Sequence, residues 1–462
     1  RATEAAKSIA VLSFVDMSPE KDQEYFCDGI AEEIIHTLTR IKNLKVVARS
    51  SAFAFKNKQA DLREVGRILD VETILEGSIR KSGECLRITA QLIKVSDGSH
   101  IWSERYDRDL KDVFAIQDEI SRAIADNLKV KVLNEPMAIV PKRHSENIEA
   151  YSLYLKGMYH WQKLTADGYR KAAEYFEQAL QIDPNYALAY IGFAYVIGMG
   201  TFWGNVLPHE GWTKGNEYIN KALIIDSRLA EAYSALGDLN AFYFRNWKEA
   251  EDNFQYALEL NPNSSQIHIE YAIFLVLTRR YKEAVSEAEK AQQLDPLSVF
   301  TNTYVGVVYD YAGQIDKAIN ELRMYLSINQ NFFITHFHLG RAYIAIGMIK
   351  EAIPELEIAV DLSDGASLTI ATLSGCYYFI GKKDQADSLF ERLKKKSETE
   401  YVPATSFYLI HRFMGEEATA LDWLKKACDE HDSFLVWFRS HPFLIPEGSK
   451  YMALLKEEGL DY

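Results

Sequence analysis

Few residues of this chain have the types and spacing that catalysis requires. His268 and Glu270 are two residues apart, like a zinc ligand and general base in deaminases, but no Pro-Cys-x-x-Cys segment follows. On a helix these two side chains point apart, so we interpret the match as chance. His336 and His338 have the same spacing and cannot share one helix face, so we expect His336 in a core position. The four cysteines show neither CxxC nor zinc spacing.

The sequence also lacks the common motifs for phosphate binding and hydrolysis. It contains no GxxxxGK[ST], no GxGxxG after a strand, no GxSxG and no HExxH. Carboxylate pairs such as Glu283/Glu287 are typical of solvated helix faces. We therefore predict a non-catalytic chain with no cofactor, no cofactor-binding residue and no metal site. The alternative that the chain is an enzyme would be supported if the purified chain turned over a substrate.

One polar set in the amino-terminal third is a candidate contact surface. Its side chains are expected to gather at a sheet face or edge. There they are either ordinary exposed strand residues with local ion pairs, or a surface for a ligand or a second domain. The set comprises Arg49, Ser50, Arg87, Gln91, Trp102, Glu104 and Arg105.

Length and composition indicate a folded chain of two or more domains. The 462 residues are 48% hydrophobic and 26% charged. The net charge of −14 argues against direct nucleic-acid binding, because an acidic surface repels phosphates. The longest uncharged stretch, 184–208, is broken by two asparagines and four glycines, so no membrane insertion by this chain is expected. Because residue 1 is Arg, we expect a processed product or a fragment.

Most of the chain is organised by a repeat of 34 residues. Ala284, Ala318, Ala352, Ala386 and Ala420 are each 34 residues apart. Large residues typically follow four positions later and further apolar residues at seven, so each alanine begins a stripe on one helix face. About a dozen residues upstream, each unit has a second helix with its own stripe. A series of helical pairs at one period predicts a stacked array.

This pattern resembles the tetratricopeptide repeat (TPR). Leu339-Gly340 and Tyr343 match its first helix, and Ala250, Phe254, Ala257 and Pro262 match its second. Glycine allows close helix approach, and proline ends the second helix. The resemblance implies an all-α superhelix of about eight repeats over 147–430. Residues 431–462 are expected to cap the array, and residues 136–146 to form a linker.

Residues 1–135 lack the period and read as an α/β domain. Turns at 81–83 and 96–98 contain glycine and separate three strands into hairpins. In the middle strand, Leu86, Ile88, Ala90 and Leu92 are expected to face the core. The order strand-helix-strand-helix-strand-strand-strand-helix predicts a compact domain with a mixed sheet. The strands are 8–14, 44–48, 71–79, 85–95 and 99–107, and the helices are 24–41, 61–69 and 112–132.

A second resemblance covers roughly residues 7–130. The segments SIAVLSFVDMS, EYFCDGIAEEI, VVARSSAFAFK, ILEGSIRKSG, LRITAQLIKVSDGSHIWSERYDRDL and FAIQDEI are similar to the TolB amino-terminal-like domain, which is related to a flagellar outer-membrane component. In that family TPR repeats commonly follow, downstream of an adenylate cyclase, a kinase or a winged-helix regulator. The resemblance implies a sensory or regulatory module in a bacterial protein, with any catalytic domain upstream of this chain.

TPR family members bind partners in a groove lined by first helices. Carried over by repeat position, the groove residues are mostly aromatic and aliphatic, which suits an apolar segment such as an amphipathic helix. The groove could equally hold the protein's own tail or neighbouring domain. The predicted partner-binding residues are Asp238, Phe242, Ile269, Phe300, Thr303, Asp310, Tyr311, Phe337, Arg341 and Tyr378.

Two function hypotheses follow for the chain. The first is a sensory and interaction region whose groove binds a protein or peptide partner, with self-association left open. The second is a small-molecule receptor that regulates an upstream effector, with its ligand in the amino-terminal domain or where that domain meets the array. A membrane-anchored parent would place the region on the periplasmic side, which is favoured, and an unanchored parent in the cytoplasm.

Overall fold

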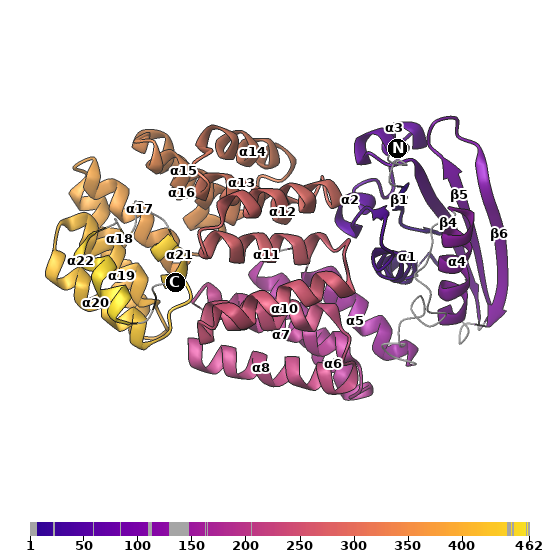
Figure 1. Cartoon of the computed structure of the whole chain (residues 1–462), viewed down its shortest axis with the longest axis horizontal. Helices are drawn as coiled ribbons and strands as arrows, with labels where there is room; N and C mark the ends of the chain where they lie inside the picture. Colours follow the sequence, from indigo (N-terminus) through magenta and orange to yellow (C-terminus); the bar gives the residue numbers. More distant parts are fainter. Residues whose placement is uncertain are drawn as a thin grey trace.

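The computed structural model contains an α/β region followed by a long array of helices (Figure 1). It describes residues 7–21, 24–58, 60–83, 85–109, 113–128, 147–161, 163, 165–204, 206–440, 445, 448–458 and 460. The expected linker 136–146 lies outside these residues. Within them, no helix is both long enough and apolar enough to cross a lipid bilayer.

The amino-terminal region is a mixed sheet with the strand order β3-β1-β4-β5-β6. Strand β1 is parallel to both β3 and β4, whereas β4, β5 and β6 form an antiparallel meander, and β2 pairs with β4. In β5 the expected alternation is confirmed, with Leu86, Ile88, Ala90 and Leu92 buried. The strands are β1 (Lys7–Val11), β2 (Val15–Asp16), β3 (Leu44–Val46), β4 (Thr73–Ser82), β5 (Cys85–Lys94) and β6 (His100–Asp109).

Helices cover both faces of this sheet. Helices α1 (Glu24–Thr39) and α4 (Val113–Asn127) bury one apolar face, and α2 (Arg49–Phe53) and α3 (Leu62–Leu69) bury the other. Asp61 accepts a hydrogen bond from the backbone of Arg63 at 2.8 Å and so caps the start of α3. Helix α2 and strand β2 were missed by the sequence prediction, because elements of two to five residues are too short to show a period.

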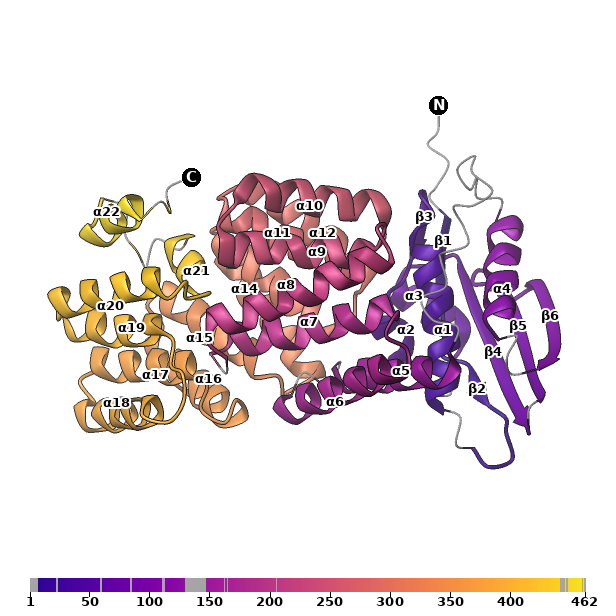
Figure 2. The same cartoon turned by 90° about the horizontal axis from the view of Figure 1, so that it is seen from below.

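The array consists of consecutive helix pairs, each joined by a short turn. The pairs follow one another along the array (Figure 2), and most first helices pack against the first helix of the next pair, which makes them the inner helices of the curve. The helices are α5 (Ile148–Trp161), α6 (Ala166–Ile182), α7 (Ala187–Phe202), α8 (Pro208–Ile225), α9 (Ala230–Leu239), α10 (Trp247–Leu260), α11 (Ser265–Leu277), α12 (Tyr281–Leu294), α13 (Val299–Tyr311), α14 (Ile315–Ile328), α15 (Phe333–Ala345), α16 (Ile349–Leu362), α17 (Ser367–Phe379), α18 (Lys383–Ser397), α19 (Ala404–Met414) and α20 (Glu417–Asp429).

Small residues set the spacing of the array. The five alanines of the 34-residue period are fully buried, as their stripe predicts. A Cβ atom on Gly306 of α13 would lie 2.8 Å from Leu322 of α14, and one on Gly340 would lie 2.7 Å from Leu356. Only glycine allows the two helices of a pair to approach this closely without displacing the facing leucine.

Two irregular segments depart from the repeat. Helix α9 continues into a π-helical turn, η2 (Asn240–Phe244), which is followed by Arg245 with a positive φ. The connection from α7 to α8 carries Trp203 and Gly204 toward later repeats. Trp203 contacts Phe333 of α15, with ring centroids 4.9 Å apart, and a Cβ on Gly204 would meet Pro403 before α19. The curve of the array is therefore bridged from its second pair to its later pairs.

The array ends in two short helices, α21 (Leu435–Ser440) and α22 (Lys450–Glu457). Helix α22 packs on the last pair, where the Tyr451 and Tyr408 ring centroids are 5.5 Å apart. Helix α21 instead turns inward to α11. The sequence-based expectation that all of 431–462 is a cap thus describes only part of the segment.

The amino-terminal region is docked on the array through hydrogen bonds at two turns. Asp295 accepts from Ser50 Oγ, from Ser51 N at 3.1 Å and from Ser51 Oγ at 2.5 Å. Ala48 N donates to Leu294 O at 2.8 Å, beside this cluster. At the next turn, Asn263 Nδ2 donates to the carbonyl oxygens of Thr39 and Ile41, at the end of α1. These contacts position α1 and α2 against the concave side of the array.

Candidate binding site on the concave face of the array

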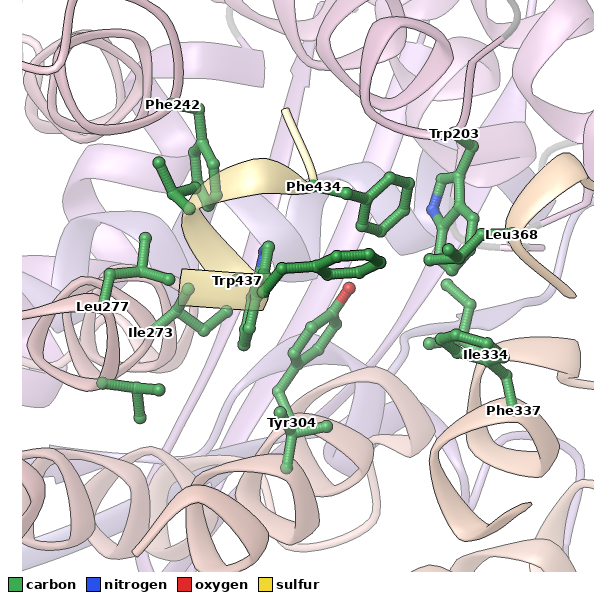
Figure 3. Close-up of a cluster of buried hydrophobic side chains, with 14 of the residues drawn as sticks. Trp203, Phe242, Ile273, Leu277, Tyr304, Ile334, Phe337, Leu368, Phe434 and Trp437 are labelled. Atoms are coloured by element: carbon green, nitrogen blue, oxygen red, sulfur yellow. The ribbon is translucent and has the colours of Figure 1, made fainter. Parts of the chain in front are cut away.

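The groove of the array is partly filled by the chain's own carboxy-terminal segment. Figure 3 shows Phe434 and Trp437 projecting among side chains of the inner helices. The Trp437 ring lies 6.5 Å from that of Phe242 and 5.4 Å from that of Tyr311. Every residue from Leu435 to Ser440 is buried. An apolar helix thus occupies the groove, and it belongs to this chain.

Backbone hydrogen bonds fix α21 in this position. Tyr311 Oη donates to Trp437 O at 3.2 Å, and Arg279 Nη2 donates to Arg439 O at 3.1 Å. Ser440 Oγ donates to Leu277 O at 3.1 Å. The partners are donors on α13 and on the turn after α11 and an accepting carbonyl oxygen of α11, so one end of the segment is held by two successive repeats.

The insertion after α7 covers the same aromatic cluster from the opposite side. Trp203 packs on Phe434 with ring centroids 5.4 Å apart, and Phe202 packs on the same ring at 4.4 Å. The Trp212 indole donates to Ser433 Oγ at 3.1 Å. The connection between α7 and α8 and the helix residues that flank it therefore form part of the enclosure of α21.

Six of the ten sequence-predicted groove residues are buried. Phe242 and Tyr311 meet α21, while Thr303 Oγ1 and Thr335 Oγ1 are hydrogen-bonded at 2.6 Å between two inner helices. Burial raises the pKa of Asp310, and nearby Arg341 opposes the shift. The six are Phe242, Ile269, Thr303, Asp310, Tyr311 and Phe337.

The other four predicted residues are partly buried and lie in different surroundings. Arg341 Nη2 donates to Tyr311 Oη at 3.1 Å, beside α21. Tyr378 Oη donates to Asp387 on the second helix of its own pair. Asp238 and Phe300 line a separate open cavity. As partner-binding residues, all ten stay a prediction.

The cavity lies between the amino-terminal region and the concave face, and its volume is about 490 Å³. Its walls come from α1, α2 and the inner helices α5, α7, α9, α11 and α13, with Trp437 of α21 also in its lining. The aromatic and apolar part of the lining includes Trp161, Tyr195, Met199, Phe300 and Tyr304. A concave, mostly apolar space with a few polar groups is the usual form of a small-molecule site.

Carboxyl groups supply much of the polar lining. Burial raises the pKa of Glu270 to about 7, although Ser234 and Gln266 donate hydrogen bonds to it. Burial and the nearby charge of Glu270 raise the pKa of Asp238. Glu32 also has a raised pKa because of burial, with Arg49 opposing the shift from 3.1 Å. Bringing these groups together costs free energy when they are ionised.

The polar set proposed for the amino-terminal sheet is split by the structure. Arg49 and Ser50 begin helix α2 and face the array, so their expected place on the sheet was wrong. Arg87 and Arg105 stay on exposed strands, where both pair with Asp107, at 2.5 and 3.0 Å. Arg49 and Ser50 are separated from the strand residues because they belong to α2, a helix of five residues that the sequence analysis did not predict.

The histidines singled out in the sequence have structural roles. His268 Nδ1 lies 2.6 Å from Glu287, and its Nε2 lies 2.9 Å from the carbonyl of Pro262. His336 repeats the arrangement with Glu355 and the carbonyl of Gln330, which confirms its core position. Glu270 points elsewhere, into the cavity lining, as the helical spacing from His268 requires.

The residues that join the two regions and complete the cavity were mostly not recognised from sequence. Ser51, Asn263 and Asp295, which form the junction, were not among the predicted contact residues. A possible signal is that Asp295-Pro296 and Asn261-Pro262-Asn263 are neighbouring turns on one edge of the array. Glu270 was set aside with the deaminase-like pair.

Comparison with known proteins identifies the class of the array. Two family models, both described as tetratricopeptide repeat, match residues 168–186 and 239–299. The chain therefore carries TPR repeats, in agreement with its helix pairs and with the role of such repeats in protein interaction. The region before them is a mixed sheet with helices.

One curated relative is named "Putative adenylate cyclase 3", from Rhizobium meliloti (strain 1021). It is 39% identical to this chain over 207 residues, which is 44% of this chain and 35% of the relative. The aligned part thus spans about a third of that relative's length.

Several solved structures match parts of this chain at low sequence identity. The human IFIT1 dimer with m7Gppp-AAAA is 14% identical, with a TM-score of 0.48, over 76% of this chain and 78% of that one. The Cut9-Hcn1 hetero-tetramer of the APC/C is 15% identical, with a TM-score of 0.47, over 75% of this chain and 63% of that one. The TPR protein YrrB is 21% identical with a TM-score of 0.28, over 43% of this chain and 98% of that one.

Proposed function

We propose that this chain is the non-catalytic interaction region of a larger bacterial signalling protein, and that its groove binds an apolar helical segment of a protein partner. The TPR repeats and the cyclase relative support this proposal. In it, the amino-terminal region is a TolB amino-terminal-like domain. An effector such as a cyclase, a kinase or a winged-helix regulator belongs to the parent protein, and a membrane anchor in that parent would place the region in the periplasm.

The observation that carries the proposal is the seating of α21. Helix α21 and the residue before it, Phe434, place three aromatic side chains (Phe434, Trp437 and Phe438) among Phe242, Tyr311 and other side chains of the inner helices. The groove thus accommodates an aromatic helical segment in helix-in-groove fashion. A partner segment with similar side chains would displace α21 and gain the same contacts.

Selection from a peptide library tests this function. Random 16-residue peptides displayed on phage are selected against the purified chain and against its Phe242→Ala and Tyr311→Ala variants. We expect enriched peptides with two or three aromatic residues at helical spacing, and at least about tenfold weaker binding to both variants. Phe379→Ala is the matched control, because this ring is 70% exposed. Enriched peptides that bind all variants equally would contradict the proposal.

A second function is favoured by the open cavity. Its volume of about 490 Å³ lies within the range of small-molecule sites, and its walls come from both the amino-terminal region and the array. A ligand there would contact both regions at once and stabilise their docked arrangement. The chain would then act as a small-molecule receptor for its parent protein. A metabolite that raises the melting temperature at micromolar concentration would support this function.

A further inference from the structure

Three carboxyl groups line the cavity from two neighbouring inner helices. Glu231 and Asp238 are seven residues apart on α9 and so share one face, and Glu270 projects from α11. Glu231 Oε2 is buried with no hydrogen-bond partner among the described residues, and Asp238 is partly buried in the same lining. Glu270 is hydrogen-bonded only to the uncharged groups of Ser234 and Gln266.

The basic groups that line the same cavity do not neutralise these carboxylates. His36 Nδ1 is 3.6 Å from Glu231, but burial and the neighbouring Arg40 lower the pKa of His36 to about 3, so its ring is neutral. Arg49 is paired with Glu32 at 3.1 Å. Lys163 lies over the ring of Tyr159, with its Nζ 4.5 Å from the ring centroid.

Aromatic rings and a further acceptor stand beside the carboxylates. Burial and the charges of Glu270, Asp238 and Glu231 raise the pKa of Tyr195, whose hydroxyl donates to the backbone carbonyl oxygen of Glu231 at 3.4 Å. Burial and Asp238 likewise raise the pKa of Tyr304. Asn261, another lining residue, is only 3% exposed, and its Oδ1 has no partner. A buried amide oxygen without a donor costs free energy until a ligand supplies one.

We propose that this cavity binds an organic ammonium ion, with its charge between Asp238, Glu270 and Glu231 and its carbon skeleton against the aromatic and apolar wall. The proposal rests on the second function above and names its ligand class. An ammonium group brings up to three N–H donors to acceptors that lack them. Tyrosine and other aromatic faces attract the same charge through cation–π contacts.

The size of the cavity and the composition of its lining fit such a ligand. A volume of about 490 Å³ holds a small diamine or a quaternary amine together with water. Met199, Ile273 and Phe300 provide an apolar wall for the alkyl part. Because the lining combines acceptors that lack donors with apolar side chains, it favours a cation that also carries a hydrocarbon portion.

Matched four-carbon probes test the charge that the cavity selects. Putrescine, 1,4-butanediol and succinate have similar lengths and carry positive, zero and negative charge; choline adds a quaternary cation, and MgCl₂ a simple one. Each is measured against the whole chain by isothermal titration calorimetry and by thermal shift. We expect binding by putrescine or choline alone. If succinate, butanediol or magnesium binds and the two amines do not, the proposed ligand class is wrong but the receptor function stands. If none of the probes binds, the proposed binding site is wrong.

Two variants then locate the bound cation. Asp238→Asn and Glu270→Gln are expected to weaken amine binding at least about tenfold, because each removes a charge-assisted contact. Neither should impair folding, since burial already disfavours the ionised forms. Glu259→Gln is the control, because Glu259 is exposed on α10 outside the cavity. Amine binding that is unchanged in both cavity variants would overturn the proposal. The phage-selected peptides described above test the groove separately.

Discussion

At the scale of single residues, buried carboxyl groups dominate the response to pH. Glu33 lies on α1 and has a pKa raised to about 8 by burial and by Glu32, and the pKa of Glu270 is raised to about 7. A raised carboxyl pKa means that the folded state binds protons more tightly than the unfolded state. Its stabilising contribution is present below the unfolded pKa of 4.5 and is lost as the pH rises through the folded pKa.

We therefore expect the melting temperature to fall between about pH 6.5 and pH 8.5. His36 acts in the opposite sense, but its lowered pKa confines that effect to lower pH. Glu33→Gln should reduce the fall and raise the melting temperature at pH 8.5 by about 2 °C. Differential scanning fluorimetry at both pH values measures this, with Glu259→Gln as the control. An unchanged pH slope in Glu33→Gln would show that Glu33 does not titrate in this range.

Sequence patterns located some of these residues and missed others for a physical reason. Repeat position brought Asp238, Phe242 and Tyr311 to attention, because first-helix positions face inward whatever the side chain. The same reasoning cannot tell an open wall from one covered by α21, since that depends on residues far along the chain. Glu270 was discarded with His268 because the two point apart, and this separation is what turns Glu270 toward the cavity.

At the scale of elements, the glycines of the first helices determine how closely each pair packs. Gly306→Ala should cost about 1–3 kcal/mol, because its Cβ would lie 2.8 Å from Leu322 Cγ. Gly215→Ala in α8 is a matched control, since a Cβ there meets nothing within 4 Å. The control should be neutral or slightly stabilising through its helix propensity. Urea unfolding of both variants measures the difference, and equal stabilities would refute the packing argument.

Elements with a long period were predicted from sequence, and short ones were not. The alanine spacing identified the second helices of the array because each repeats a burial pattern over many units. Helix α2, with five residues, and the π-turn after α9 carry no such signal. Pro354 shows the limit of local rules, because it lies inside α16 beyond the first turn, where a proline removes a backbone hydrogen bond.

At the scale of the whole molecule, Asp295 joins the amino-terminal region to the array. Replacing it with Ala removes the acceptor for Ser50 and Ser51 and should cost about 3 kcal/mol at the junction. We expect a larger radius of gyration by small-angle X-ray scattering and faster amide exchange in α2. Asp183→Ala, which changes the Asp-Pro turn of the first pair, is the control. An unchanged radius and unchanged exchange in Asp295→Ala would show that other contacts suffice for docking.

The overall architecture followed from sequence as two neighbouring parts, a mixed sheet with helices and a TPR array. The docking of these two parts on each other could not be predicted, because it depends on pairs such as Asn263 with Thr39 and Asp295 with Ser51, which are more than 200 residues apart. Local periodicity carries no information on such distant pairs. The division of the chain at residues 135 and 147 stays a prediction.

The central claim is that the groove is a binding surface for which α21 and a partner segment compete. Fluorescence anisotropy of a labelled peptide of residues 431–445 tests it most directly, with the wild-type chain and with its Phe434→Ala/Trp437→Ala variant. Because the variant weakens the resident segment, it should bind the peptide at least about tenfold more tightly than the wild type. A peptide carrying the same two changes should not bind. Equal binding to both chains, or none to the folded variant, would contradict the account.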